Sequence, residues 1–181
     1  MTSEQELARR GALVVILTLL GGCGDVVAPA ADAEGGDPAG PCVAPYQLVM
    51  GGCYRVSTSF VSWPTAETAC EADGAHLATI DNVPEHSVLH TLGTGAAVTE
   101  VWIGYTDRVT EGTFRWVSVG GLDPSTDKCF FGTAGPVNSA EDDCVVQESA
   151  NACGDWFVRD CSLTRPYICE RDGHVAMSSA F

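Results

Sequence analysis

Basic residues are scarce in this sequence. Nine lysines and arginines face 24 aspartates and glutamates, so the formal net charge is −15 at pH 7. Nucleic acids and anionic membrane surfaces are poor partners for a protein with that charge. Basic proteins, cations and neutral ligands remain open as partners.

The sequence also lacks the residue patterns of common catalytic sites. No combination of Ser, Cys or His residues indicates nucleophilic catalysis. His86 and His90 are four positions apart, a spacing found in zinc proteases, but Ser87 stands where such a protease carries its catalytic Glu. We therefore expect a protein that is not an enzyme, with both histidines in structural roles.

The apolar run near the N-terminus is too short to span a bilayer. It covers residues 11–20, well below the ~20 residues that a transmembrane helix needs. It follows two arginines and leads into Leu-Gly-Gly-Cys23, an arrangement typical of the signal peptide of a bacterial lipoprotein. We therefore expect removal of residues 1–22, export, and lipidation of Cys23. Gly24 stands in place of the Asp that marks inner-membrane retention, which favours the outer membrane or the cell surface.

Three further regions follow the lipidated cysteine. Residues 23–41 contain mainly Ala, Gly, Asp and Pro, which cannot bury enough surface to fold, so we expect a disordered tether spanning about 24 Å. Residues 42–171 fit one folded domain. Residues 172–181 show no periodic pattern and are expected to form a frayed tail.

Patterns in the domain predict two helices and then strands. Ser62 precedes a Trp-Pro pair and marks the start of the first helix, which Gly74 ends. Asn82 caps the second helix, with Pro84 in its first turn, and the Gly-Thr-Gly of residues 93–95 stops it. Leu77 and Ile80 form a short buried segment between the helices. Strands are expected at residues 101–105, 114–117, 144–147 and 166–170.

Eight of the nine cysteines lie within the domain. In an exported protein such an even set indicates a disulfide framework, although eight cysteines allow 105 pairings. Cys42 and Cys53 bracket a strand and a Gly-Gly turn, which predicts a small hairpin closed by one bridge. The stretch 120–143 is rich in Gly, Asp, Pro and Ser, and so long a loop in a small domain is usually functional.

The order of the motifs resembles that of a C-type lectin-like domain covering residues 42–171. The motifs are Trp102-Ile103-Gly104, Glu111-Gly112-Thr113-Phe114-Arg115-Trp116, Asp143-Cys144, Trp156 and Tyr167-Ile168-Cys169-Glu170. The resemblance implies an α+β fold with two helices, a small mixed antiparallel sheet and a long loop region that carries ligands.

The same resemblance implies a pairing of the cysteines. It pairs Cys70 with Cys169, between the first helix and the last strand, Cys144 with Cys161 at the loop region, and Cys42 with Cys53. Cys129 and Cys153 are left, and we pair them by elimination. A native bridge in such a domain typically contributes ~2–5 kcal/mol to stability.

The resemblance also implies a calcium site beside the long loop. At the matching positions this sequence has Asp107, Glu111, Asp142 and Asp143, with Asn138 as a carbonyl donor. Such oxygen ligands suit Ca²⁺, which takes 6–8 of them. The alternative is that these are solvated acids on the surface of a strongly acidic protein.

The family's sugar site needs a Glu-Pro-Asn or Gln-Pro-Asp triplet and an Asn-Asp pair after a Trp. This sequence reads Gly-Pro-Val-Asn138 at the first element and Trp156-Phe157-Val158 at the second. Phe157 and Val158 cannot coordinate a hard cation, so the calcium-bridged sugar site is incomplete. Asn138, Asp142 and Trp156 remain as ligand-binding candidates, whereas the other three tryptophans occupy positions that the family uses for its core.

Two functions are open. The first is an exported, lipid-anchored recognition module that binds a glycan or an extracellular protein through the long loop, supported by calcium. The second is a structural protein of the cell envelope without a small-molecule ligand. The oligomeric state is left open.

Overall fold

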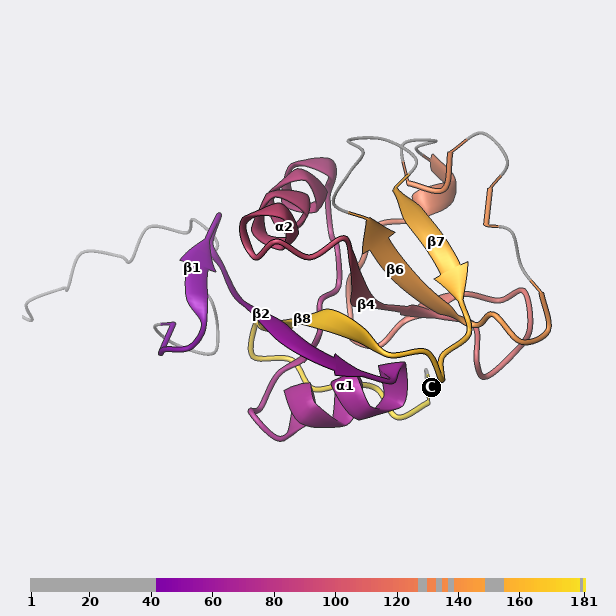
Figure 1. Ribbon diagram of the computed structural model, residues 1–181, viewed down its shortest axis with the longest axis horizontal. Helices are drawn as coiled ribbons and strands as arrows, with labels where there is room; N and C mark the ends of the chain where they lie inside the picture. The colour runs from indigo at the N-terminus through magenta and orange to yellow at the C-terminus, as the bar shows by residue number, and fades with distance from the viewer. Residues whose placement is uncertain (1–41, 127–129, 133–134, 137–138, 149–154, 180) are drawn as a thin grey trace, which may run out of the picture. The chain divides into compact units, whose positions relative to one another are not determined.

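A computed structural model describes residues 42–126, 130–132, 135–136, 139–148, 155–179 and 181 (Figure 1). The elements in chain order are β1 Gln47–Val49, β2 Gly52–Val61, α1 Trp63–Glu71, β3 His76–Leu77, α2 Val83–Gly95, β4 Glu100–Thr106, β5 Arg115–Trp116, the 3-10 helix η1 Pro124–Thr126, β6 Cys144–Glu148, β7 Trp156–Arg159 and β8 Arg165–Arg171. Within this described part, neither helix has the length and apolar character needed to cross a membrane.

The strands form one mixed sheet with the order β1-β2-β8-β4-β6-β7, while β3 pairs with β8 and β5 with β4. The strand pairs are antiparallel apart from β4 and β8, which run parallel and pair Trp102 with Tyr167. Figure 1 shows α1 and α2 on opposite sides of the ribbon formed by β2 and β8. The expected α+β architecture, with two helices and a mixed sheet, is therefore confirmed.

Three strands, β2, β3 and β7, do not appear among the expected strands. The ten-residue strand β2 pairs with β8 over most of its length, but Thr58, Ser59 and Phe60 are exposed, so it lacks a clear apolar alternation. The strand β3 has only two residues. Long-range pairing with β8 and β6 forms these strands, and a local pattern cannot report such pairing.

The two helix starts differ in their hydrogen bonds. Asn82 caps α2 as expected, and its Oδ1 accepts the backbone N–H of Glu85 at 3.0 Å. Ser62 is the N-cap residue of α1, but among the described residues its hydroxyl pairs with the Thr65 hydroxyl (2.8 Å) instead of a backbone N–H. The Gly-Thr-Gly at residues 93–95 does not stop α2 but forms its last turn.

Three of the predicted disulfides are present. They join Cys42 to Cys53, Cys70 to Cys169, and Cys144 to Cys161, with Cα–Cα distances of 5.5, 5.5 and 5.2 Å. The bridge Cys70–Cys169 connects α1 to β8 over a sequence separation of 99 residues. Cys129, Cys153 and the expected lipidation site Cys23 lie outside the described residues.

The core on the α1 side is centred on two tryptophans. Trp63 and Trp102 are fully buried, and their indole N–H groups donate to the carbonyls of Ile103 (2.9 Å) and Val61 (3.0 Å). The ring of Phe181 lies 5.7 Å from that of Trp63 in an edge-on arrangement. The end of the chain therefore contacts the core, so the expectation of a frayed tail is not met at this residue.

Candidate functional site

Three acidic residues meet at the end of β4. The Thr106 hydroxyl donates to the Asp143 carbonyl at 2.6 Å, and the backbone N–H of Asp107 donates to the same carbonyl at 3.1 Å. One carboxylate oxygen of Asp107 accepts the N–H of Gly112 at 2.8 Å, which closes a tight turn and brings Glu111 back toward the strand end. As a result, Asp107, Glu111 and Asp143 each present a carboxylate oxygen, all within 4.8 Å of one another.

This acidic cluster suits a hard cation. Asp107 is buried, Asp143 is partly buried and Glu111 is exposed, so an ion could approach from solvent. Carboxylates held this close repel one another, and a divalent cation would offset the repulsion. Oxygen ligands alone, without His or Cys, fit Ca²⁺ in preference to zinc.

One of the predicted calcium ligands, Asp142, stands apart from the cluster. The side chain of Asp142 accepts a hydrogen bond from the Ser139 hydroxyl at 2.8 Å, and its N–H donates to the Ser139 carbonyl at 2.9 Å. Asp142 therefore closes a local turn and does not belong to the cluster of described residues. Asn138 lies outside the described part of the chain.

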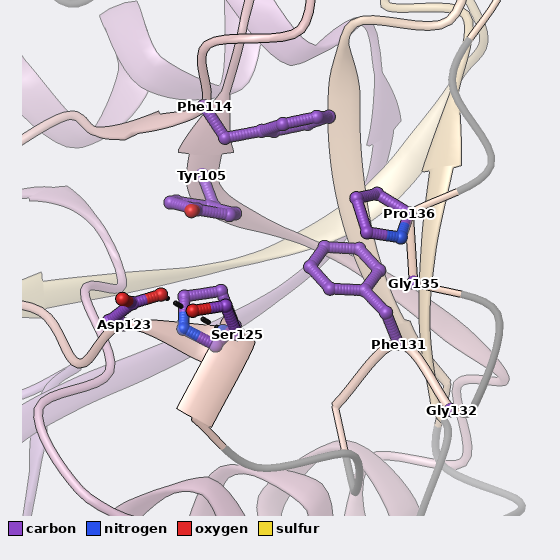
Figure 2. A pocket seen from close by; sticks show the side chains of 9 residues that line it. Tyr105, Phe114, Asp123, Ser125, Phe131, Gly132, Gly135 and Pro136 are labelled. Atoms are coloured by element: carbon purple, nitrogen blue, oxygen red, sulfur yellow. Dashed lines mark hydrogen bonds between the residues drawn. The ribbon is translucent and has the colours of Figure 1, made fainter.

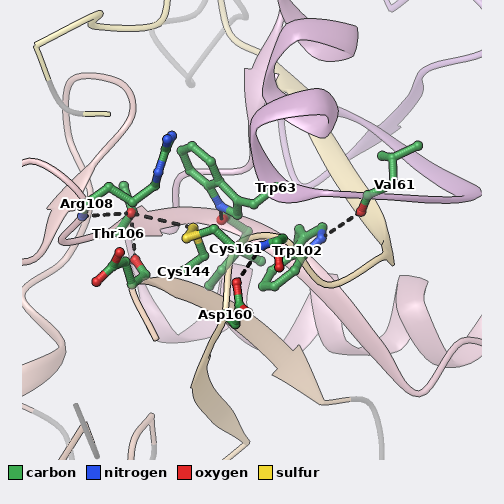
Figure 3. Close-up of a disulfide and its surroundings, with 11 residues drawn as sticks. Val61, Trp63, Trp102, Thr106, Arg108, Cys144, Asp160 and Cys161 are labelled. Carbon is green, nitrogen blue, oxygen red and sulfur yellow. Dashed lines mark hydrogen bonds between the residues drawn. A yellow bond between two sulfur atoms is a disulfide. The ribbon is translucent and has the colours of Figure 1, made fainter. Parts of the chain in front are cut away.

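A disulfide fixes the position of Asp143. Figure 3 shows Cys144–Cys161 beside Trp63 and Thr106, and the Thr106 hydroxyl lies 3.8 Å from the Cys144 sulfur. The carbonyl of Cys161 accepts the backbone N–H of Trp63 at 3.0 Å. The bridge therefore connects the start of β6, next to Asp143, with the start of α1, and it orders one side of the cluster.

The residues at the position of the family's sugar site form a strand. Trp156, Phe157 and Val158 belong to β7, which pairs with β6. Trp156 is only 2% exposed and packs against Phe130, with ring centroids 4.6 Å apart, so its ring has no open face for a ligand. The guanidinium of Arg159 lies 4.8 Å from the centre of the Phe157 ring. These side chains offer apolar contacts and no oxygen ligands.

An aromatic pocket lies beside the loop region (Figure 2). Its volume is about 280 Å³, and its lining residues are Tyr105, Phe114, Asp123, Pro124, Ser125, Phe131, Gly132, Gly135 and Pro136. This pocket is not among the sites predicted from the sequence. The available signal was a Phe-Phe pair at residues 130–131, inside a polar loop, where a large apolar side chain needs a structural or binding role.

The pKa values of two pocket residues are shifted, one by burial and nearby charge and the other by hydrogen bonds. Burial, together with the charges of Asp123 and Asp107, raises the pKa of Tyr105 to about 12, so its hydroxyl stays neutral. Hydrogen bonds from Ser125 hold the pKa of Asp123 below its usual range, so its carboxylate stays ionised near pH 7. The pocket therefore combines apolar walls with one negative charge.

The fold and motifs match a known family. The sequence model of the Lectin C-type domain matches residues 59–171, more than half of the chain. The chain belongs to the C-type lectin family. Mouse C-type lectin domain family 4 member E is 32% identical over 132 residues, which cover 71% of this chain and 59% of that protein. Human CD209 antigen is 32% identical over 131 residues, which cover 72% of this chain and 31% of that protein. This C-type lectin therefore spans less than two thirds of the length of these relatives.

Solved structures agree on the C-type lectin fold. A Kupffer cell C-type lectin receptor, Clec4f, described as trimeric, matches with a TM-score of 0.60 and 28% identity, covering 71% of this chain and 83% of that one. A Ca²⁺-dependent type II antifreeze protein in its Ca²⁺-free form matches with a TM-score of 0.61 and 23% identity, covering 71% of this chain and 98% of that one. The curated relatives named here are animal proteins, so they give no support to a bacterial lipoprotein type.

Proposed function

We propose that this C-type lectin domain is a non-catalytic recognition module that binds a carbohydrate or a protein, with Ca²⁺ bound at the acidic cluster. The observation that carries the proposal is the placement of Asp107, Glu111 and Asp143 around one point, with their oxygens within 4.8 Å. Membership of the lectin family supports recognition over catalysis.

The three carboxylates would hold the ion, and the ion would supply positive charge that offsets their repulsion. The chain's own contribution is to hold the carboxylates in place before the ion arrives. The backbone contacts of Asp107 with Asp143 and Gly112, together with the disulfide at Cys144, do this. Calcium would thereby stabilise the base of the loop without touching the ligand.

Ligand contact would come from a different set of residues. Phe157 and Val158 in β7 stand where the family's sugar site needs an amide and a carboxylate, so they offer a sugar no bridging ion. The aromatic pocket lined by Tyr105, Phe114 and Phe131 is the concave surface next to the loop region. We therefore assign it to the ligand-binding face.

The proposal includes export and a lipid anchor at Cys23. Three disulfides among the described residues fit an oxidising compartment, where such bridges persist. Metabolic labelling of the full chain with a palmitate analogue tests the anchor. We expect label and membrane association in the wild type and loss of both in Cys23→Ala. An unlabelled wild type in the soluble fraction would contradict the anchor and leave the recognition role intact.

A glycan and protein array tests the recognition role. We expect the wild type to bind one class of ligand, and a chelator or the substitution Asp107→Asn to weaken that binding. If the wild type binds nothing on either array, with or without Ca²⁺, the structural envelope role becomes the better explanation.

A further inference from the structure

We propose that the aromatic pocket is a binding site for a small organic cation, an alkylammonium group of the trimethylammonium type. The inference rests on the proposed function and deepens it, because it names the ligand class of the pocket on the ligand-binding face. It depends on the wall, the charge and the size of the pocket.

Three aromatic rings form the wall. Tyr105 and Phe114 stack with centroids 5.3 Å apart and planes at 25°, and Phe131 lies 6.3 Å from the first ring and 6.1 Å from the second. Figure 2 shows these rings around the pocket, with Pro136 beside Phe131. A cation within about 6 Å of an aromatic ring centre is attracted by the negative face of the ring, and cages of such rings recognise quaternary ammonium groups.

Buried tryptophans hold the rings in place. The Tyr105 ring lies 4.6 Å from that of Trp116, and the Phe131 ring meets Trp156 edge-on at 5.6 Å. The Trp116 indole donates to the carbonyl of Leu122 at 3.0 Å, which fixes the chain just before Asp123. A wall that is ordered before binding reduces the entropy lost when a ligand binds.

The charge around the pocket favours a cation. Asp123 lies at the pocket, and its Oδ1 accepts the backbone N–H of Ser125 at 2.9 Å. None of the nine described lining residues is basic, and the whole chain carries −15. An anion would be repelled, whereas a neutral apolar ring would use the aromatic wall but gain nothing from the carboxylate. Charge complementarity therefore selects a cation.

The size of the pocket limits the ligand to one small group. The volume of about 280 Å³ lies at the lower edge of the roughly 300–1,000 Å³ that is usual for ligand pockets. A head group such as trimethylammonium is compact and lacks hydrogen-bond donors. It therefore matches a wall of rings and prolines that offers few acceptors.

A pair of matched probes tests the inference on the full chain. Choline carries a trimethylammonium group, and 3,3-dimethylbutan-1-ol is its neutral isostere. We expect choline to shift the NMR signals of the Tyr105 and Phe114 rings and to bind at least several-fold more tightly than the isostere. Equal binding of the two probes would overturn the inference. A neutral monosaccharide that shifts these signals when choline does not would overturn it too.

Two variants locate the charge. Asp123→Asn should weaken choline binding about 3- to 5-fold, a size typical of an exposed charge pair, and leave the isostere unaffected. Asp160→Asn is the matched control, because the Asp160 carboxylate is exposed to solvent and accepts the N–H of Ser162 at 2.8 Å. This is the same kind of local turn as that between Asp123 and Ser125. If both variants weaken choline binding equally, the assignment to Asp123 is wrong and the inference falls.

The calcium dependence of choline binding distinguishes the pocket from the acidic cluster. We expect choline to bind equally well in Ca²⁺ and in chelator, because Trp116 and Trp156, and not the ion, hold the pocket rings in place. Loss of choline binding in chelator would show that the pocket depends on an ion at the acidic cluster, and it would overturn the inference. Absence of any Ca²⁺ effect on the protein, with choline binding intact, would contradict the calcium-supported role and leave the pocket assignment in place.

Discussion

The imidazole Nε2 of His86 lies 3.0 Å from a carboxylate oxygen of Asp155, and both side chains are buried, with 3% and 0% exposure. His86 is in α2, whereas Asp155 directly precedes β7. Gln147 of β6 joins the pair, since its amide donates to the His86 carbonyl at 3.2 Å. The contact links α2 to the sheet edge behind the loop region, and it confirms a structural role for His86.

Removal of one member of this pair should be costly. We expect Asp155→Ala to lower the free energy of unfolding by about 3–5 kcal/mol, because the substitution leaves the other polar group buried without its partner. Urea unfolding measures the change. Asp73→Ala is the control: its carboxylate is 45% exposed in the ion pair with Arg55 (2.8 Å), so the expected loss is below about 1 kcal/mol. Equal losses in both variants would contradict a special role for the buried pair.

Stability should fall as the pH rises from about 5 to above 8. Burial, reinforced by the charge of Glu85, raises the pKa of Glu170 to about 8, whereas the unfolded chain titrates near the usual value of 4.5. The folded state therefore keeps a proton that the unfolded state has lost. The resulting stability is complete below the unfolded pKa and disappears as the pH passes the folded pKa. Burial also raises the pKa of Glu67 to about 7, which acts in the same direction.

Urea midpoints at pH 5 and pH 8.5 measure this dependence. Glu170→Gln should flatten this pH dependence, because an amide does not titrate. The amide oxygen can still accept the backbone N–H of Thr79, which reaches a Glu170 oxygen at 2.9 Å in the wild type. The exposed Glu141→Gln is the control and should keep the wild-type slope. If Glu170→Gln leaves the pH dependence of stability unchanged, other titrating groups cause that dependence.

Calcium should stabilise the folded domain through the acidic cluster. A ligand that binds only the native state adds ~2.7 kcal/mol at a hundredfold excess over Kd, so Ca²⁺ should raise the melting temperature and a chelator should remove the increase. Asp107→Asn should abolish the shift. Asp142→Asn should retain it, because Asp142 bonds to Ser139 and stands outside the cluster. Loss of the shift in both variants would show that Asp142 is a ligand after all.

The bridge Cys70–Cys169 should stabilise the folded state more than the hairpin bridge Cys42–Cys53 does. It closes a sequence separation of 99 residues, whereas Cys42–Cys53 closes 11. Chain entropy in the unfolded state gives roughly 4–5 kcal/mol for the first and roughly 3 kcal/mol for the second. Thermal unfolding of the two double-alanine variants compares them. An unchanged melting temperature after full reduction of the wild type would refute stabilisation by disulfides altogether.

Local chemistry explains which predictions succeeded. The cap at Asn82 and the strand at residues 101–105 depend on neighbouring residues, so their patterns are visible in the sequence. The glycine of the Trp-Ile-Gly motif, Gly104, has a physical reason, because the backbone approaches it closely. A Cβ at this residue would lie 2.6 Å from the Leu77 carbonyl oxygen, which is too close for any larger residue. The position of the acidic cluster followed from the family resemblance, and the structure brings three of its four predicted carboxylates together.

Other features depend on contacts between distant segments. Trp156 looked like a ligand-stacking residue beside a loop, but the pairing of β7 with β6 turns its side chain into the core. Asp142 is a different case, because a local turn with Ser139, three residues before it, takes its side chain away from the cluster. The pairing of β7 with β6 has no local signal in the sequence.

The sequence by itself determined the charge, the elements with strong caps and motifs, and the three described disulfide pairings through a family pattern. Only the tertiary structure decided which carboxylates share one point and that Tyr105, Phe114 and Phe131 enclose a pocket. The reason is that periodicity and capping act over a few residues, whereas a site is formed when packing brings together side chains from segments far apart in the chain.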